Sequence, residues 1–227
     1  SRFSRRHRVV AGAPPGAADL LAKLTGLSKG VGKDAMRKGA VWVSRSGRTP
    51  NRSRRETATV RPGDVLEIHY DPALLALRPP EAGLVRDAVR WSAWAKPAGL
   101  LSQGTEFGDH ASLLRQVEKT LDREVFLVHR LDREVEGLVL VAHDAGAAAA
   151  LSALLREAKV VKRYRAEVIG DVAASRGETG VVDEPIEGKP ARTSFRVLAR
   201  DPERDTTTLE VTIETGRHHQ IRRHLDA

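Results

Sequence analysis

Short apolar runs with the composition of β-strands recur along the chain after residue 84. They restrict the folds that this part of the chain can adopt. Strand patterns include VFLV, GLVLVA, RAEVI, SFRVL and TLEVTI, several of them with apolar residues at alternate positions. Two helical patterns, ASLLRQVEKTL and AGAAAALSALLREA, lie between them. Strands that dominate with helices interspersed predict an α+β domain with a mixed, largely antiparallel sheet.

The first part of the chain has a different pattern, which predicts a small α/β domain. Residues 17–25 carry apolar side chains at helical spacing, Ser28 is a candidate N-cap for a second helix, and Gly39 is a candidate stop. Strand patterns follow in VWV and in RPGDVLEIHY. A stretch with a Pro pair and no strand periodicity comes next. We expect a domain at 1–72 with a basic N-terminal tail, a linker at 73–83 and a second domain at 84–227.

The charge balance predicts a polyanionic partner. Lys and Arg number 38 against 30 Asp and Glu, a formal net charge of +8, which favours nucleic acid, with a membrane surface as the rival. The sequence has no apolar run of about 18 residues, and its first ten residues lack the apolar core of a signal peptide. We therefore expect a cytoplasmic protein. The absence of cysteine excludes disulfides, thiolate nucleophiles and cysteine-ligated metals.

Three basic residues of the second predicted helix share one face. Lys29, Lys33 and Arg37 stand at spacing i, i+4, i+8. Such a stripe could follow a phosphate backbone. It could equally be an ordinary solvated face, and the glycines at 30 and 32 weaken the helix prediction itself.

A polar loop between two apolar runs contains the first candidate for chemistry. In VHRLDREVEGLVLVA, Asp132 follows His129 and Arg130. Side chains at the end of a rigid strand are well placed for catalysis, although an aspartate among arginines is more often a structural turn residue. The loop is not the kinase sequence H-R-D-x-x-x-x-N, because the order here is H-R-L-D and the asparagine is missing.

The last motif, TGRHHQIRRHL, contains three histidines, His218, His219 and His224. Their spacing lacks the i, i+4 pair with an intervening Glu that is typical of zincins. We therefore predict no metal site. The histidines and arginines fit better as a basic cluster that meets phosphate or a carboxylate.

Tyr164 lies in KVVKRYRAEV, where cationic residues bracket its ring. A splayed-out RNA base stacks on an aromatic face of this kind. The alternative, that the ring fills the core, stays open on this stretch alone.

Residues 17–70 resemble the S4 RNA-binding domain. The resemblance rests on the two helices, on KGAVWVSRSGR and above all on GDVLEI. Ser44 and Arg45 stand where that family usually has an Asn-Gly turn. The resemblance implies RNA binding, with Arg45 and Arg48 of this turn among the contacts.

Residues 84–227 resemble the RluA-type pseudouridine synthases through four motifs in the family's order. These are KPAG at 96–99, HRLD at 129–132 with the glycine at 137, KRYRAEVIG at 162–170 and TGRHHQIRRHL at 215–225. Val135 and Glu136 replace the family's usual Thr-Ser, and His218 fills a variable place. Relatives usually continue for a few tens of residues, so we expect the C-terminal end to be truncated.

The resemblance implies roles for individual residues. Asp132 stands at the family's essential aspartate, Tyr164 at its active-site tyrosine and Arg222 at the basic partner of the aspartate. Arg130 is the candidate to fill the gap left by a flipped nucleotide. The other expected RNA contacts in this part are His129, Lys162, Arg217, His219 and Gln220.

The implied activity is the isomerisation of uridine to pseudouridine in structured RNA, without cofactor or metal. Large-subunit ribosomal RNA is the first candidate substrate and tRNA the second, and we expect a monomer. The alternative is a catalytically silent RNA-binding or ribosome-assembly factor on the same fold. The joint presence of Asp132, Tyr164 and Arg222 favours the enzyme, and the Val135–Glu136 pair is the best support for the alternative.

Overall fold

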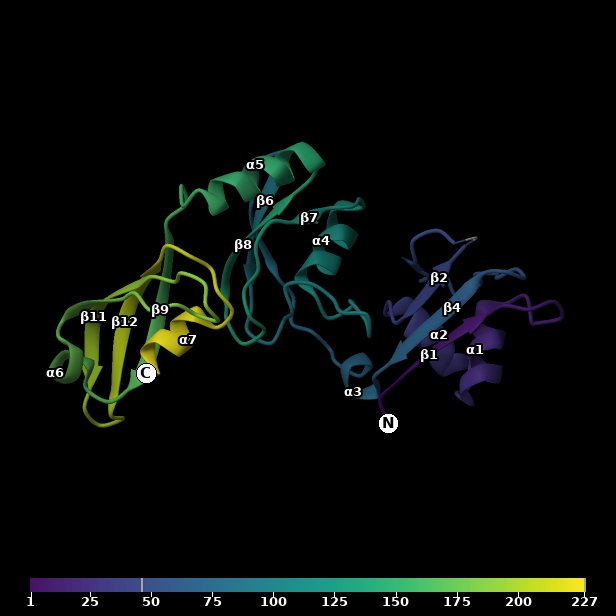
Figure 1. Ribbon diagram of the computed structural model, residues 1–227, viewed down its shortest axis with the longest axis horizontal. Coiled ribbons are helices and arrows are strands. Elements are labelled where there is room, and N and C mark those ends of the chain that lie inside the picture. The colour runs from purple at the N-terminus through teal and green to yellow at the C-terminus, as the bar shows by residue number, and fades with distance from the viewer. Residues whose placement is uncertain (46, 227) are drawn as a thin grey trace. The chain divides into compact units, whose positions relative to one another are not determined.

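The computed structural model describes residues 1–45 and 47–226. Ser46, which belongs to the polar turn of the S4-like segment, lies outside the described residues. The chain divides into two compact units, Ser1–Ala148 and Ala149–Ala227 (Figure 1). The boundary expected at 73–83 falls inside the first unit.

The first sheet of the first unit has the strand order β1-β4-β2-β3, and all of its pairings are antiparallel. Apolar residues of the two helices and the sheet form one core, in which Leu20, Leu21, Met36, Leu66 and Ile68 are at most 2% exposed. The elements are β1 (Phe3–Arg8), α1 (Ala17–Thr25), α2 (Lys29–Arg37), β2 (Val41–Ser44), β3 (Asn51–Arg52) and β4 (Val65–Tyr70).

Both helices begin and end where the sequence indicates. α1 covers residues 17–25 as expected, and the Ser28 side chain caps α2 by accepting a hydrogen bond from the Val31 N–H at 3.3 Å. Gly39, predicted as the stop, has a φ of 79°, in the left-handed region that favours glycine. The second helix therefore forms despite its two glycines.

The expected basic tail is a strand. Phe3–Arg8 form β1, which pairs with the whole of β4. Arg6 stands directly opposite Glu67, and their side chains form an ion pair at 3.1 Å. Cross-strand ion pairs of this kind stabilise a strand that offers little apolar alternation.

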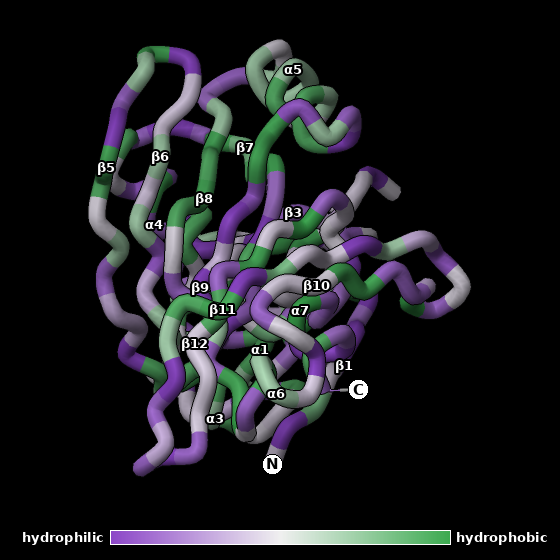
Figure 2. The backbone as a smooth tube through the Cα atoms, turned by 90° about the vertical axis from the view of Figure 1, so that its left-hand side faces the viewer, coloured by the Kyte–Doolittle hydropathy of each residue, from purple (hydrophilic) through white to green (hydrophobic). Residues whose placement is uncertain are grey.

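The second sheet of the first unit has the order β5-β6-β8-β7, again antiparallel. Its core side chains include Trp94, Val139 and Val141, which are at most 3% exposed, and Figure 2 shows the hydrophobic run along β8. Arg54 and Asp109 form an ion pair, with 2.8 Å between Nη1 and Oδ1, that links this part of the unit to the first sheet. The elements are α3 (Pro72–Leu75), β5 (Gly83–Asp87), β6 (Trp91–Lys96), α4 (Leu113–Leu121), β7 (Phe126–Leu127) and β8 (Gly137–Ala142).

The second unit contains one antiparallel sheet of order β10-β11-β12-β9, with the short helices α6 and α7. Leu209, Val211 and Ile213 alternate along β12 and face the core, where Ile221 and Leu225 of α7 pack against them. Helix α5 (Ala145–Arg156) crosses the boundary between the units. The other elements are β9 (Lys162–Ile169), α6 (Val172–Arg176), β10 (Thr179–Val182), β11 (Thr193–Asp201), β12 (Thr206–Ile213) and α7 (Gln220–Leu225).

The predicted class is confirmed, because the three sheets formed by the described residues are antiparallel and helices lie between their strands along the chain. No helix in the described part of the chain is long and apolar enough to cross a membrane.

Candidate active site

The loop that carries Asp132 joins β7 to β8 within the first unit. It runs from residue 128 to residue 136, and Asp132 is half-buried at its centre. Gly137, the first residue of β8, has a φ of 143°, a conformation that side chains disfavour. Asp132 therefore lies in the loop between two strands, and not directly at the end of either.

The KPAG turn holds the residue that follows Asp132. The Gly99 N–H donates to the Arg133 carbonyl at 2.7 Å, and Gly99 has a φ of 88°. The Lys96 ammonium, 1% exposed, donates to the carbonyls of Leu100 at 2.7 Å and of Arg133 at 3.3 Å. Burial lowers the pKa of Lys96, while Glu134 and Asp132 act in the opposite direction. The motif that is weakest in sequence thus fixes the loop of the candidate catalytic aspartate.

The two basic residues before Asp132 have different surroundings. His129 Nε2 accepts a hydrogen bond from the Leu140 N–H at 3.0 Å, which ties the imidazole to β8 and places a ring proton on Nδ1 when the imidazole is neutral. Arg130 is exposed. Of the two expected RNA contacts, Arg130 is the more exposed, since His129 is half-buried.

Tyr164 lies on β9 in the second unit, opposite Val211 of β12. Its half-buried ring packs against the core cluster that contains Leu209 and Val211. The sequence left open whether the Tyr164 ring stacks on a base or fills the core, and part of the ring does pack against the core. The ring is held in a fixed place, as a stacking platform requires.

Lys162, two residues earlier on β9, is bound to backbone. Its ammonium donates to the carbonyls of Glu214 at 3.1 Å and Thr215 at 3.3 Å, and burial lowers its pKa. These bonds attach the start of the last motif to β9. The RNA contact expected of Lys162 stays a prediction, and the bonds that it makes in the structure position the motif.

Gln220 was also expected to contact RNA, but it is 3% exposed and all four of its hydrogen-bonding positions are used. Its Oε1 accepts from the Thr215 hydroxyl at 2.7 Å and the Arg217 N–H at 3.0 Å. Its Nε2 donates to the Arg192 carbonyl and to Thr193 Oγ1, both at 3.0 Å. In this arrangement Gln220 organises the turn before α7.

His224 extends this buried network. Thr193 Oγ1 accepts from Gln220, so its own proton is available to His224 Nδ1 at 2.8 Å. His224 Nε2 then donates to the Glu184 carbonyl at 3.0 Å. Both ring nitrogens are engaged in hydrogen bonds, so His224 offers no position for a metal in this arrangement.

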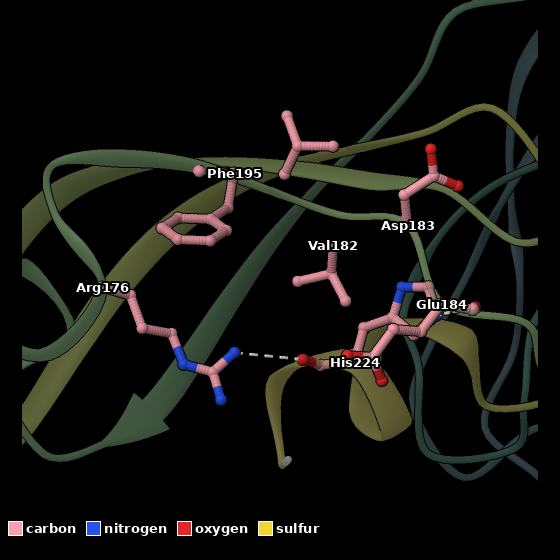
Figure 3. A pocket seen from close by; sticks show the side chains of 8 residues that line it. Arg176, Val182, Asp183, Glu184, Phe195 and His224 are labelled. Atoms are coloured by element: carbon pink, nitrogen blue, oxygen red, sulfur yellow. Dashed lines mark hydrogen bonds between the residues drawn. The ribbon is translucent and has the colours of Figure 1, made fainter.

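A pocket of about 400 Å³ lies beside His224 in the second unit (Figure 3). Its wall combines apolar and charged side chains. Arg176 Nη1 donates to the His224 carbonyl at 3.3 Å, and Asp183 pairs with Arg192 at 2.7 Å. The described lining contains neither Tyr164 nor Arg222, so the pocket is separate from the candidate site. It is lined by Arg176, Gly180, Val181, Val182, Asp183, Glu184, Phe195 and His224.

The hydrogen bonds of Gln220 and His224 hold α7, the helix that carries Arg222. Arg222 is exposed, next to Ile221, which packs against the core. Arg217 Nε donates to the Pro190 carbonyl at 2.9 Å, and the rings of His218 and His219 stack with 3.7 Å between centroids. The second unit therefore holds both Tyr164 and Arg222 on one scaffold, while Asp132 belongs to the first unit.

Replacing Gln220 with leucine should destabilise the protein strongly. The change removes the partner of the Thr215 hydroxyl proton and of the Arg217 N–H. It also removes one of the two partners of the Arg192 carbonyl and of the buried Thr193 Oγ1. The cost is about 1–3 kcal/mol for each group that stays unpaired. Denaturant unfolding measures the loss, and the exposed Gln103→Leu should stay within about 0.5 kcal/mol of wild type. Wild-type stability together with weakened RNA binding would instead support the RNA contact expected from sequence.

The basic stripe on α2 is paired with acidic side chains. Lys29 contacts Asp19 at 2.7 Å and Lys33 contacts Glu56 at 3.7 Å. Arg37 pairs with Glu56 and with Asp34, and the Arg37 hydrogen bond is the main influence lowering the pKa of Glu56. RNA phosphates would have to displace these acids. By contrast, Arg45 and Arg48 are exposed on the turn after β2.

Comparison with known proteins agrees with the four motifs. The model of the RNA pseudouridylate synthase family matches residues 90–227. An uncharacterized RNA pseudouridine synthase of Chloroflexus aurantiacus is 33% identical over 198 residues, which are 77% of this chain and 61% of the relative. Ribosomal large subunit pseudouridine synthase D of Nitrosomonas europaea is 36% identical over 154 residues, 57% of this chain and 42% of the relative. The chain thus spans about half the length of these relatives.

Solved structures show the same fold. Human RNA Pseudouridylate Synthase Domain Containing 4 has a TM-score of 0.52 at 24% identity, with 63% of each chain covered. Human RNA Pseudouridylate Synthase Domain Containing 1 has a TM-score of 0.53 at 20% identity, covering 65% of this chain and 66% of that one. With the family model matched from residue 90 onward, the chain belongs to the RNA pseudouridylate synthase family, as its RluA-type motifs predict.

Proposed function

We propose that this protein is an RNA pseudouridine synthase, an isomerase that converts uridine to pseudouridine in structured RNA. The observation that carries the proposal is the half-buried Asp132 at the centre of a loop held by the KPAG turn. Family membership supports the reaction type. A carboxylate presented on a fixed loop suits chemistry at a sugar carbon, as in glycoside hydrolysis.

The reaction breaks the bond between N1 and C1′, rotates the uracil and joins C5 to C1′. C5 then loses a proton and the freed N1 gains one. Atoms balance within the nucleotide, so no redox partner is needed. Asp132 can attack the sugar or the base covalently, stabilise positive charge at C1′, or abstract a sugar proton to give a glycal. All three routes need an ionised carboxylate, and Arg222 is proposed as its cationic partner.

The remaining roles concern the base. A paired uridine must leave the helix before it can react, and the exposed Arg130 is proposed to fill the space that it leaves. Tyr164, held against the core of the second unit, would stack on the detached uracil and assist removal of the C5 proton.

The RNA target proposed is large-subunit ribosomal RNA, ahead of tRNA. A curated relative from Nitrosomonas europaea is named a ribosomal large subunit pseudouridine synthase, and one from Vibrio vulnificus, 31% identical over 150 residues, a dual-specificity RNA pseudouridine synthase. Pseudouridine mapping of total RNA with and without the gene tests this assignment. Loss of a site from tRNA alone would reverse the order of the targets, and loss from neither RNA would favour the catalytically silent factor.

The first sheet and its two helices are proposed to be an S4-like RNA-binding module. Arg45 and Arg48 are its strongest candidate contacts, because both side chains are exposed. Their replacement by glutamine should weaken RNA binding and reduce the slope of log K against log salt by about 0.9 for each lost phosphate contact.

Fluorescence anisotropy across a salt series measures this slope. Lys29→Gln is the comparator, because Asp19 already offsets the Lys29 charge, and it should change the slope less. An unchanged slope in the Arg45→Gln/Arg48→Gln variant would show that this turn does not contact RNA.

A further inference from the structure

A buried serine lies against the residue that precedes Asp132. Ser102 is 4% exposed, and its Oγ accepts from the Leu131 N–H at 3.0 Å and donates to the Leu131 carbonyl at 2.6 Å. One hydroxyl thus satisfies both backbone groups of the same residue. Leu131 is itself buried, at 8% exposed, so water is a poor substitute for these bonds.

The backbone of Ser102 is itself fixed. Its carbonyl accepts from the Leu114 N–H at 3.2 Å, at the start of α4. The neighbouring Leu101 accepts from Leu113 at 2.7 Å and donates to Ala111 at 3.2 Å. These are bonds between backbone groups and do not involve the Ser112 hydroxyl, and they hold the segment that presents the Ser102 hydroxyl to the loop.

The two neighbours of Asp132 are held by the same segment of chain. Residues 96 and 99 bind the carbonyl of Arg133 on one side, and Ser102 binds Leu131 on the other. With both flanking residues fixed, the backbone of Asp132 has little freedom to shift. A catalytic group has to be held within a fraction of an ångström of its working position.

We propose that Ser102 is a positioning residue that sets the place of the Asp132 carboxylate. The proposal rests on the proposed function for the role of Asp132, but the contact itself does not. Loss of the hydroxyl leaves two buried backbone groups to find other partners, which shifts the loop. Because Ser102 is buried, its loss should affect the rate and leave RNA affinity unchanged.

The test compares Ser102→Ala with Ser112→Ala. Ser112 is 1% exposed and makes the same types of bond, accepting from the Arg115 N–H at 3.3 Å and donating to the Asp109 carbonyl at 2.7 Å. Its bonds cap α4 and do not touch the Asp132 loop. Ser102→Thr keeps a hydroxyl and serves as the rescue variant.

Single-turnover rates at saturating RNA should fall about 10- to 100-fold in Ser102→Ala, with Kd unchanged, and should recover in Ser102→Thr. Ser112→Ala should keep the wild-type rate at a temperature where all variants are folded. An equal fall in both alanine variants, or none in Ser102→Ala, would overturn the proposal.

A second measurement does not depend on activity. Amide hydrogen exchange over residues 128–136 should accelerate in Ser102→Ala and stay at the wild-type rate in Ser112→Ala. Unchanged exchange in Ser102→Ala would show that the serine does not hold the loop. An inactive wild-type protein with accelerated exchange in Ser102→Ala would contradict the proposed function and leave the positioning contact supported.

Discussion

Asp132→Asn should abolish isomerisation while RNA affinity stays within a few-fold of wild type. Asparagine keeps the size of the side chain but removes the charge that every proposed route requires. The half-buried position of Asp132 on a loop held through both neighbouring residues means that the substitution should not move the backbone. Release of tritium from RNA labelled at uracil C5 measures loss of the C5 proton directly.

Glu134→Gln is the matched control, since it removes an exposed carboxylate two residues further along the same loop. We expect it to release tritium at the wild-type rate. Appreciable turnover by Asp132→Asn, or an equal loss in Glu134→Gln, would rule out Asp132 as the catalytic carboxylate.

Tyr164→Phe should bind RNA nearly as well as wild type and turn over about 10²- to 10⁴-fold more slowly, the range typical of general acid–base catalysis. The ring supplies stacking and its packing against Leu209 and Val211, and both survive in phenylalanine. The phenolic oxygen is lost, and with it the proposed help in removing the C5 proton. Tyr164→Leu should lose affinity as well, by roughly 1–3 kcal/mol.

Single-turnover kinetics with C5-deuterated uridine separates the two roles. The isotope effect should be larger in Tyr164→Phe than in wild type, because proton removal becomes slower. Tyr70→Phe, at the only other tyrosine, is the control, since Tyr70 packs in the core of the first sheet. A Tyr164→Phe variant as fast as wild type with no isotope effect would leave Tyr164 as a stacking platform only.

The sequence predicts elements well where one local rule decides them. The Ser28 cap and the Gly39 stop place α2 correctly, and alternation along β12 identifies the residues that face the core. Strand β1 is missed because its stability comes from a partner distant in sequence. Its Arg6 is matched by Glu67 across the sheet, a pairing that no local pattern reveals.

The surroundings of a side chain are harder to predict from the sequence than its chemical character. Gln220 and Lys162 have the polarity of RNA-binding residues, but their hydrogen bonds go to backbone and side chains of the second unit. Likewise, the basic stripe of α2 is visible in sequence, whereas the acids that pair with it, Asp19 and Glu56, come from other segments. Motif matching indicates which residues belong to the site, and only the structure distinguishes those that hold it together.

The most direct test of the account is product analysis with the purified chain acting alone on total RNA from a strain that lacks its gene. Such RNA contains the natural target in its unmodified form. We expect pseudouridine to appear at a discrete site in the same amount as uridine is lost, and Asp132→Asn bound to the same RNA to form none. RNA binding by the wild-type chain without any pseudouridine formed would contradict the account and identify a catalytically silent RNA-binding protein.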